Sequence, residues 1–256
     1  MAISDVARRN HDELFGDQVS TWSRTDPDLV EYLDNFAFDE VVSHGNLAPR
    51  LRLMVQLAAL IACQGHGEYE VILGAALAHG LTPTEAKEIV YHAVAYLGVG
   101  RVFDFLVITN DVLTERGVEL PLPRQTTTTR ETRFDAGWVA QERIVGEQRL
   151  TDMHANAPAD EQHIQRWLTA NCFGDHYTRG GLEFETRELL TFVLLVAQGG
   201  CDPQVRSHVA GNLRVGNDRA VLLDTLSQLV PYIGYPRTLN GLAALNAIAP
   251  PAGKDS

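Results

Sequence analysis

Residues 199–216 read GGCDPQVRSHVAGNLRVG, a stretch that closes one apolar run and begins a new helix. Asp202 and Pro203 suit a helix start, because a carboxylate accepts the free N–H groups there and proline has no N–H to lose. His208 then lies about one turn beyond Gln204 on the same helix face. A titratable imidazole beside an exposed amide indicates a candidate site, although a lone histidine on a helix more often serves packing.

Helical patterns continue on both sides of this stretch. Residues 82–85, TPTE, form a cap with proline in the first turn and begin a helix that runs to about residue 97. The other expected helices cover residues 4–17, 26–42, 51–64, 68–80, 101–116, 136–144, 159–171, 186–198, 203–215, 219–232 and 237–249. No stretch alternates apolar and polar residues as a half-buried strand would. We therefore predict an all-α protein.

The acidic composition restricts the classes of partner. The chain has 256 residues and a formal net charge of −12. Its share of hydrophobic residues, 45%, is typical of globular proteins. Nucleic-acid surfaces need clustered Lys and Arg, and no basic run is present. The longest apolar runs, residues 53–63 and 192–197, are too short to span a bilayer, and no secretory signal is recognisable. We expect a cytoplasmic protein with neither nucleic-acid nor membrane partners.

The two halves of the chain repeat each other. At an offset of 135 (173 − 38), Phe38, Gly45, Leu47, Arg52, Ala62 and Gly65 meet Phe173, Gly180, Leu182, Arg187, Ala197 and Gly200. After one added residue near Cys201 the offset is 136 (213 − 77), where Leu77, Gly80, Val94, Tyr96, Gly98, Arg101 and Leu106 meet Leu213, Gly216, Val230, Tyr232, Gly234, Arg237 and Leu242. We predict a tandem duplication with a first copy at residues 1–116, a linker at 117–133 and a second copy at 134–256.

The copies differ at chemically active positions. His208 meets Ile72, and an isoleucine can neither transfer a proton nor bind an anion. The other exchanges are Asp175 with Glu40, Arg179 with His44 and Gln228 with His92. The second copy is therefore expected to bear the site, and the first copy is expected to be a degenerate packing partner.

These repeats resemble a known family. The second copy reads FGDHYTRGGLEFETRELLTFVLLVAQGGCDPQVRSHVAGNLRVG and then PYIGYPRTLNGL, and the first copy reads LRLMVQLAALIACQG and AYLGVGRVFDFL. Together they resemble the carboxymuconolactone decarboxylase family of the alkylhydroperoxidase D-like superfamily, over most of residues 30–115 and 165–248. The resemblance implies two fused helical bundles in a pseudo-symmetric pair. Single-copy members assemble as rings, so a homo-oligomer, a trimer of two-copy chains, is expected.

The resemblance also implies site residues and a reaction. His208 is the expected proton-transfer residue, and Asp175 is its expected acidic partner, with Glu40 as a possible substitute. Arg179, or else Arg187 or Arg237, would hold a substrate carboxylate, because a guanidinium offers a planar fork of donors. The remaining expected substrate-binding residues are Gln204, Cys201, Tyr177 and Tyr232.

The expected reaction needs no metal and no organic cofactor. Loss of carbon dioxide from a carboxylated lactone leaves a carbanion or dienolate, which must regain a proton at carbon, and a histidine can supply it. The leading interpretation is a cofactor-independent lyase or isomerase acting on a small oxygenated carboxylic acid or lactone. Decarboxylation, isomerisation and dehydration remain open.

Two other functions stay open as alternatives. The thiol peroxidases of the superfamily use a Cys-x-x-Cys pair, but here Gln204 replaces the second cysteine and no resolving disulfide can close. Cys201 alone, at a helix N-terminus, could still be reactive. The odd number of cysteines, Cys63, Cys172 and Cys201, favours reduced thiols. The second alternative is a non-catalytic ring-forming protein that binds a metabolite or another protein.

One further pair of residues has metal-ligand spacing. Glu88 and His92 lie four residues apart and could share a metal on one helix face. No second Glu/His set accompanies them, so a solvated pair or a pair contacting other helices is the preferred interpretation.

Overall fold

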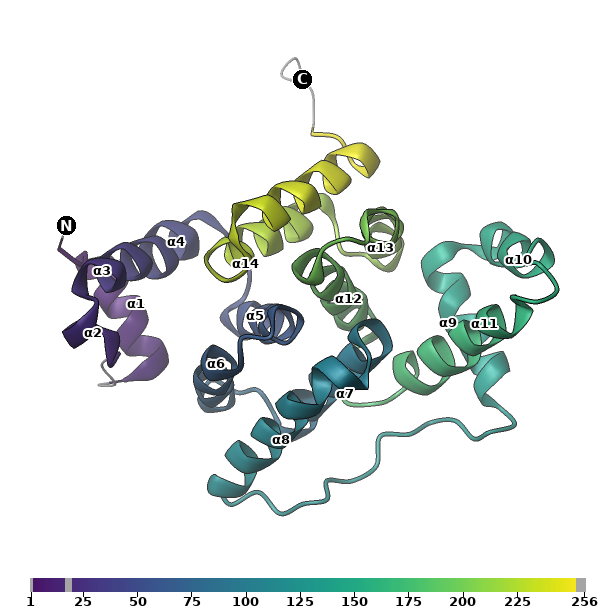
Figure 1. Cartoon of the computed structure of the whole chain (residues 1–256), viewed down its shortest axis with the longest axis horizontal. Coiled ribbons are helices and arrows are strands. Elements are labelled where there is room, and N and C mark those ends of the chain that lie inside the picture. Colours follow the sequence, from purple (N-terminus) through teal and green to yellow (C-terminus); the bar gives the residue numbers. More distant parts are fainter. Residues whose placement is uncertain (1, 17–19, 252–256) are drawn as a thin grey trace.

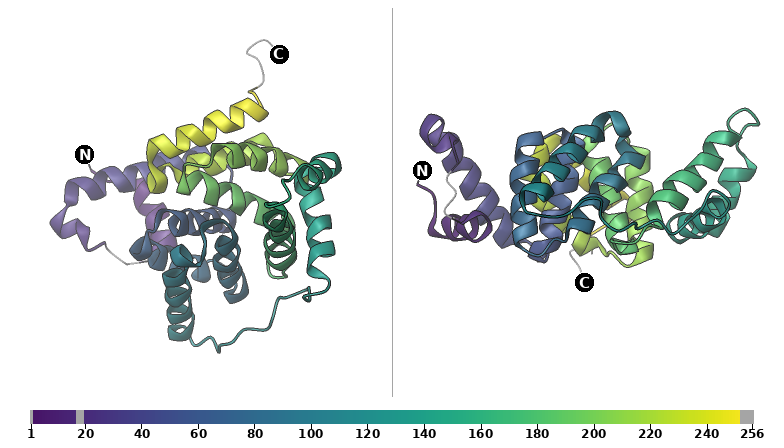
Figure 2. Two further views of the ribbon diagram at one scale, coloured as in Figure 1. Left: turned by 45° about the vertical axis from the view of Figure 1, so that its right-hand side comes forward. Right: turned by 90° about the horizontal axis from the view of Figure 1, so that it is seen from below.

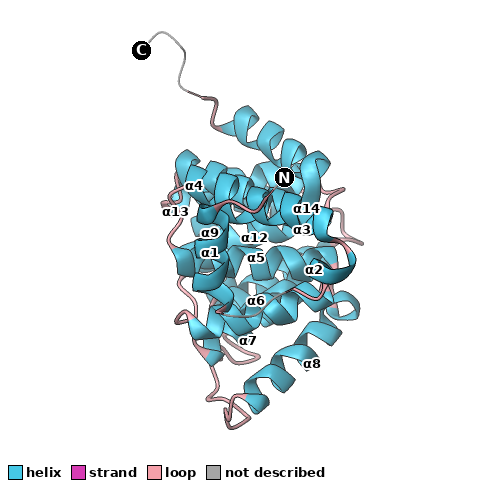
Figure 3. Cartoon of the chain, turned by 90° about the vertical axis from the view of Figure 1, so that its left-hand side faces the viewer, coloured by secondary structure: helices cyan, strands magenta, loops and turns pink. Residues whose placement is uncertain are grey.

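The structure, a computed structural model, describes residues 2–16 and 20–251. Within those residues it contains helices and loops but no strand (Figure 3), which confirms the predicted all-α fold. The helices in chain order are α1 (Asp5–Phe15), α2 (Trp22–Thr25), α3 (Pro27–Asn35), the π-helix η1 (Phe36–Val41), α4 (Val42–His44), α5 (Pro49–Cys63), α6 (His66–Ala78), α7 (Pro83–Leu97), α8 (Val99–Glu115), α9 (Arg133–Val145), α10 (Glu147–Ala155), α11 (Gln162–Trp167), the π-helix η2 (Leu168–Tyr177), α12 (Phe184–Gln198), α13 (Asp202–Val215) and α14 (Arg219–Ile248).

The start of α7 follows the predicted cap. The Thr82 hydroxyl accepts from the Glu85 N–H, and the Glu85 carboxylate accepts from the Thr82 N–H. The start of α13 differs from the prediction, because its N-cap residue is Cys201, whose side chain makes no capping hydrogen bond among the described residues, and not Asp202. Asp202 instead lies in the first turn, where a negative charge faces the positive end of the helix dipole.

Several helices differ from the sequence prediction. The predicted helix at 26–42 is divided into α3, η1 and α4, and the one at 159–171 is a short α11 followed by η2. The looser π-helical turns do not follow the 3.6-residue period from which the helices were predicted. Helices α2 and α10 were not predicted. The predicted helix at 4–17 ends at a residue outside the described part of the chain.

The repeat is visible in the arrangement of helices (Figure 1). Helices α5 and α12 are repeat counterparts and pack against each other at the centre of the molecule. Likewise α6 corresponds to α13, and α7 and α8 correspond to the two parts of α14. Gly98 separates α7 from α8 with φ 77°, and Gly234 interrupts α14 with φ 75°. A positive φ is readily adopted only by glycine, so both copies turn the chain at the same glycine.

The two copies interleave around one core. Helix α7 of the first copy packs on α12 and η2 of the second, and α14 of the second copy packs on α5 and η1 of the first. A single cluster of buried apolar side chains runs through α5, α6, α7, α12, α13 and α14. Neither copy therefore forms its central contacts from its own residues alone.

The remaining helices lie at the two sides of this centre. In Figure 2 the N-terminal helices project on one side and α9–α11 on the other. Between α8 and α9 the chain is extended, and it is tied to the second copy where Gly180 N–H donates to Gln125 O over 2.9 Å. The domain limits themselves stay a prediction. No described helix is both long enough and apolar enough to cross a membrane.

Candidate active site

His208 on α13 is paired with a carboxylate of the central helix α12. Its Nδ1 lies 2.8 Å from Oε1 of Glu188, and Glu188 is completely buried. The other carboxylate oxygen, Oε2, accepts from the hydroxyl of Tyr177 on η2. A buried carboxylate is costly unless it is hydrogen-bonded, and here both of its oxygens have partners.

The hydrogen bonds continue inward from Tyr177 to the first copy. The Tyr177 hydroxyl lies 2.7 Å from Oγ1 of Thr191, and the same oxygen lies 2.8 Å from Nε2 of His92 on α7. Tyr177, Thr191 and His92 are all buried, whereas the His208 side chain is 14% exposed. We call these five residues, His208, Glu188, Tyr177, Thr191 and His92, the Glu188 network. It runs from the surface of the second copy to a helix of the first.

Burial determines which members of the network are neutral. Desolvation, reinforced by the positive charge of Arg187, holds the pKa of His92 well below its usual value, so its imidazole is uncharged. Desolvation and the nearby Glu188 raise the pKa of Tyr177 well above its usual value, so the phenol keeps its proton. Tyr96 borders the network with its ring centroid 6.0 Å from that of His208 in an edge-on orientation, and burial raises its pKa as well.

Asn212 fixes α13 against α12 beside this network. Its side-chain amide donates to the carbonyl oxygen of Glu188 over 3.1 Å and to that of His208 over 2.7 Å. The backbones that carry the imidazole and the carboxylate are thereby held in register, which preserves the distance between them.

A second buried cluster contains the arginine that was expected to bind substrate. Arg179 Nη2 lies 2.8 Å from Glu88 Oε1, and Arg187 Nη2 lies 3.0 Å from Glu88 Oε2. Glu88 comes from α7, so the cluster also joins the two copies. Because Arg179 and Arg187 are already paired with this carboxylate, their contacts are those of a structural ion-pair cluster.

Asp175 and Glu40 lie elsewhere. Asp175 pairs with Arg133 over 2.6 Å and accepts from the Asn171 amide, and Glu40 is exposed on η1. In the described part of the chain, neither makes a hydrogen bond or ion pair with His208. The carboxylate that contacts His208 is Glu188, because η2 directs Tyr177 towards it and Asp175 towards α9.

The other predicted site residues are divided between the His208 region and the rest of the fold. Gln204 is exposed one turn before His208, and Tyr177 belongs to the Glu188 network. The Cys201 Sγ lies 3.2 Å from the carbonyl oxygen of Leu195, and burial raises the pKa of its thiol. Tyr232 is half-buried on the first-copy side, where desolvation, reinforced by the nearby Glu68, raises the pKa of its phenol.

Sequence reasoning missed four residues of this region: Glu188, Thr191, His92 as a network member, and Tyr96. A signal for Glu188 was present, since at the repeat offset (188 − 135) its counterpart is Leu53. That exchange of a polar for an apolar residue matches the exchange of His208 for Ile72. Both Leu53 and Ile72 are buried, so the corresponding place in the first copy is apolar. Tyr96 is the repeat counterpart of Tyr232 (232 − 136), and it is Tyr96 that lies beside His208.

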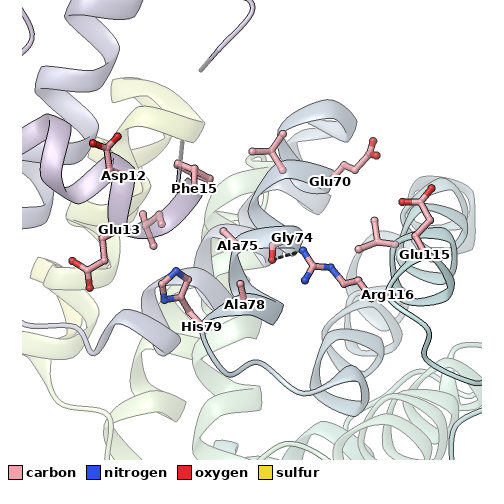
Figure 4. Close-up of a pocket in the computed structure, with 14 residues that line it drawn as sticks. Asp12, Glu13, Phe15, Glu70, Gly74, Ala75, Ala78, His79, Glu115 and Arg116 are labelled. Carbon is pink, nitrogen blue, oxygen red and sulfur yellow. Dashed lines mark hydrogen bonds between the residues drawn. The ribbon is translucent and has the colours of Figure 1, made fainter. Parts of the chain in front are cut away.

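Two hollows lie away from His208. One of about 580 Å³ lies among α1, α6 and α8 of the first copy, where Arg116 donates to the carbonyl oxygen of Gly74 (Figure 4). The other, of about 490 Å³, is lined by Glu88, Arg179 and residues 120–126 of the linker. Neither hollow is lined by a member of the Glu188 network.

Glu88 and His92 do not form a metal pair. Glu88 binds the two arginines, and His92 binds Thr191, so each contacts the second copy separately. Among the residues that the structure describes, no three His, Cys, Asp or Glu side chains are grouped as metal ligands would be.

Comparison with known proteins agrees with the repeat. The Carboxymuconolactone decarboxylase family matches the chain twice, at residues 27–111 and at residues 162–247. Each match covers most of one copy. No curated protein sequence matches the chain.

Proposed function

The chain belongs to the carboxymuconolactone decarboxylase family, and from this premise we propose that it is a cofactor-independent lyase or isomerase. Its substrate class is a small oxygenated carboxylic acid or lactone, and His208 transfers the proton. The observation that carries the proposal is the pairing of His208 with the buried Glu188 at 2.8 Å, while the imidazole stays partly exposed. A carboxylate behind a reachable imidazole is an arrangement suited to general acid–base catalysis.

Glu188 determines which nitrogen of His208 faces the substrate. An ionised carboxylate only accepts hydrogen bonds, so Nδ1 carries the hydrogen and Nε2 holds the lone pair. When Nε2 takes a proton, the imidazolium that forms is stabilised by the adjacent Glu188 charge. In an isomerisation, Nε2 removes a proton from one carbon and returns it to another.

In a decarboxylation the same atoms act in the other order. The bond between the carboxylate carbon and the substrate breaks, carbon dioxide leaves, and the electron pair remains on the substrate as a dienolate. Protonated Nε2 then delivers its proton to carbon, and solvent restores it. Both electrons of the broken bond remain on the substrate until the proton arrives, so no additional oxidant or reductant is required.

Gln204 is the predicted substrate-binding residue whose position best supports that role. It is exposed on α13 one turn before His208, where its amide can donate to a substrate oxygen. Arg179 would have to leave Glu88 to bind a carboxylate. Tyr96 supplies an apolar wall with a polar tip beside the imidazole.

The peroxidase alternative receives little support from Cys201. Desolvation raises the pKa of its thiol, whereas a peroxidatic cysteine needs a stabilised thiolate. All three cysteines are free, and Gln204 occupies the position of the second thiol. The non-catalytic alternative is an outcome of the experiment below.

We also propose that the chain forms a homo-oligomer, a trimer of two-copy chains. Val99 and Phe103 on α8 are 66% and 60% exposed, and their repeat counterparts Tyr235 and Leu239 on α14 are 63% and 57% exposed. In Figure 1, α8 lies at the bottom of the view and α14 at the top, with α5 and α12 between them. Exposed apolar side chains at repeat-equivalent positions of α8 and α14 give each chain two similar contact surfaces, which supports association of chains around a ring.

The first experiment is decarboxylation of 4-carboxymuconolactone by the wild type and His208→Ala, followed by absorbance and by release of carbon dioxide. Loss of the proton-transfer group should lower turnover about 10²–10⁴-fold. Ile72→Val, at the repeat-equivalent position, is the matched control and should keep turnover. If the folded wild type is inactive, related lactones and oxo acids are tested for deuterium incorporation at carbon. Inactivity with all of them would favour the non-catalytic alternative.

A further inference from the structure

We propose that His92, a residue of the first copy, is a positioning residue for His208. It directs the hydrogen bonds of the Glu188 network from the far side of the interface between the copies. The expected effect of His92 on turnover rests on the proposed function. Its expected effect on the tautomer of His208 can be tested without a substrate.

The first step concerns the hydrogen on His92. Its Nε2 lies 2.8 Å from Thr191 Oγ1, and its Nδ1 has no hydrogen-bond partner among the described residues. Thr191 has one hydroxyl hydrogen, and its Oγ1 is 3.0 Å from the carbonyl oxygen of Arg187, four residues earlier on the same helix. A threonine commonly donates to that carbonyl. Thr191 then receives a hydrogen bond from the Nε2–H of a neutral His92.

The second step concerns the single hydrogen of Tyr177, for which Glu188 Oε2 and Thr191 Oγ1, 2.7 Å away, compete as acceptors. The Tyr96 hydroxyl also hydrogen-bonds with Tyr177 and with Thr191. Once Thr191 Oγ1 already accepts from His92, it is the weaker competitor for the Tyr177 hydrogen. The phenol therefore donates to Glu188.

The third step connects this donation to His208. With Tyr177 donating to Oε2, the Glu188 carboxylate keeps Oε1 directed at Nδ1 of His208. The hydrogen of His208 is then held on Nδ1, and the lone pair is held on Nε2. Without the donor on His92, the Tyr177 hydrogen is shared between two acceptors, and the tautomer of His208 is less strictly determined.

The repeat provides an internal comparison for this role. The counterpart of His92 is Gln228 (92 + 136), and its Nε2 donates to the carbonyl oxygen of Val41 over 2.8 Å. At the repeat-equivalent position on α14, an amide of the second copy thus already donates to a carbonyl oxygen of the first copy. His92→Gln is therefore the conservative variant, since it keeps an N–H donor and removes the titratable ring.

The test reads the tautomer of His208 by ¹⁵N NMR on histidine-labelled protein, without substrate. In the wild type we expect the hydrogen on Nδ1. His92→Gln should keep that tautomer, whereas His92→Leu, and His92→Phe as a second donor-free variant, should give a mixture. The pH profile of turnover should shift in the donor-free variants, and turnover should fall roughly tenfold.

A second-site variant separates positioning from packing. Thr191→Val removes the competing acceptor through which His92 acts on Tyr177, so His92→Leu should then have no further effect on the tautomer. Donor-free variants that keep the wild-type tautomer and pH profile, or a wild type with the hydrogen on Nε2, would overturn the inference. So would a His92→Gln variant that behaves like His92→Leu. Because the NMR measurement needs no substrate, a wild type without turnover would count against the proposed function and not against this inference.

Discussion

Gly211 on α13 lies directly against the carboxylate of Glu188 on α12. A Cβ added at Gly211 would fall less than 3.0 Å from Glu188 Oε1 and from Cγ2 of Ile144. The missing side chain leaves the space in which Glu188 reaches His208. The repeat counterpart of Gly211 is Ala75 (211 − 136), in the copy where Leu53 replaces Glu188. The glycine is thus part of the candidate site although it has no functional group.

Gly211→Ala should displace the Glu188 carboxylate from His208. An alanine in a helix is normally more stable than a glycine by about 1 kcal/mol, but overpacking here should reverse the sign and cost about 1–3 kcal/mol. We expect turnover to fall roughly tenfold, measured with the free energy of unfolding in urea. Ala75→Gly is the matched control, with a cost of about 1 kcal/mol and unchanged turnover. A more stable and fully active Gly211→Ala would contradict the contact.

Glu188→Gln keeps the shape of the side chain and removes its charge. Turnover should fall about a hundredfold or more, because the imidazolium of His208 loses its stabilising partner. Stability should be unchanged or higher, because a buried charge is removed. Glu185→Gln, in the half-exposed pair with Arg143 on the same helix, is the control and should alter neither quantity. Equal turnover in the two variants would exclude Glu188 from the reaction.

Glu88→Ala should be strongly destabilising. Arg187 is completely buried, and without Glu88 its charge has no carboxylate partner among the residues that the structure describes, which typically costs about 3–5 kcal/mol. The repeat-equivalent Asp224→Ala (88 + 136) loses a hydrogen bond from the Asn46 N–H and should cost about 1 kcal/mol. Urea unfolding measures both variants. Similar losses for the two would show that the buried cluster contributes little.

Acidification should destabilise the fold through His92. Its pKa is held well below the usual value by burial, Arg187, His176 and His208, so below about pH 6.5 the unfolded chain binds a proton that the folded chain does not. The stability is therefore complete above pH 6.5 and lost as the pH falls, by up to about 1.4 kcal/mol per pH unit for one such histidine. Unfolding in urea between about pH 5 and pH 7 should show a shallower slope for His92→Gln. His176, whose pKa burial also lowers, should account for part of the remaining slope.

Phe103→Glu should weaken association of chains. Phe103 is 60% exposed, and a charge there would be buried without a partner if α8 contacts a second chain. Light scattering after gel filtration should give a mass above one chain for the wild type and a lower mass for the variant. Leu239→Glu, at the repeat-equivalent position, should act in the same direction. A monomeric wild type would contradict the proposed oligomer.

Much of the fold could be predicted from local signals. The apolar periodicity predicted most helices, the cap at residues 82–85 predicted the start of α7, and the gaps between the predicted helices contain Gly98 and Gly234, because these signals depend on neighbouring residues. The π-helices were missed because their wider turns break the period. His208 was placed in a candidate site by comparing the two copies. The same comparison, applied to the predicted helix at 186–198, would have shown that Glu188 corresponds to Leu53.

The contributions of His92 and Tyr96 could not be predicted in this way. They enter the site only because α7 of the first copy packs on α12 and η2 of the second. Such packing depends on the summed shape of both copies and leaves no local pattern. For the same reason Tyr232 was chosen from a pair of equivalent tyrosines, of which Tyr96 is the one beside His208.

The interleaving of α7 and α14 makes the two copies mutually dependent. Cutting the extended connection between α8 and α9 would give two half-length chains. The first would lack α14, which packs on its central helix α5, and the second would lack α7, which packs on its central helix α12. The second half would also lack His92 and Glu88. Such fragments should be inactive apart and regain function when mixed, as in a split-protein complementation assay. The first copy, which has Ile72 and Leu53 in place of His208 and Glu188, would thus be retained as an obligatory half of one folded unit.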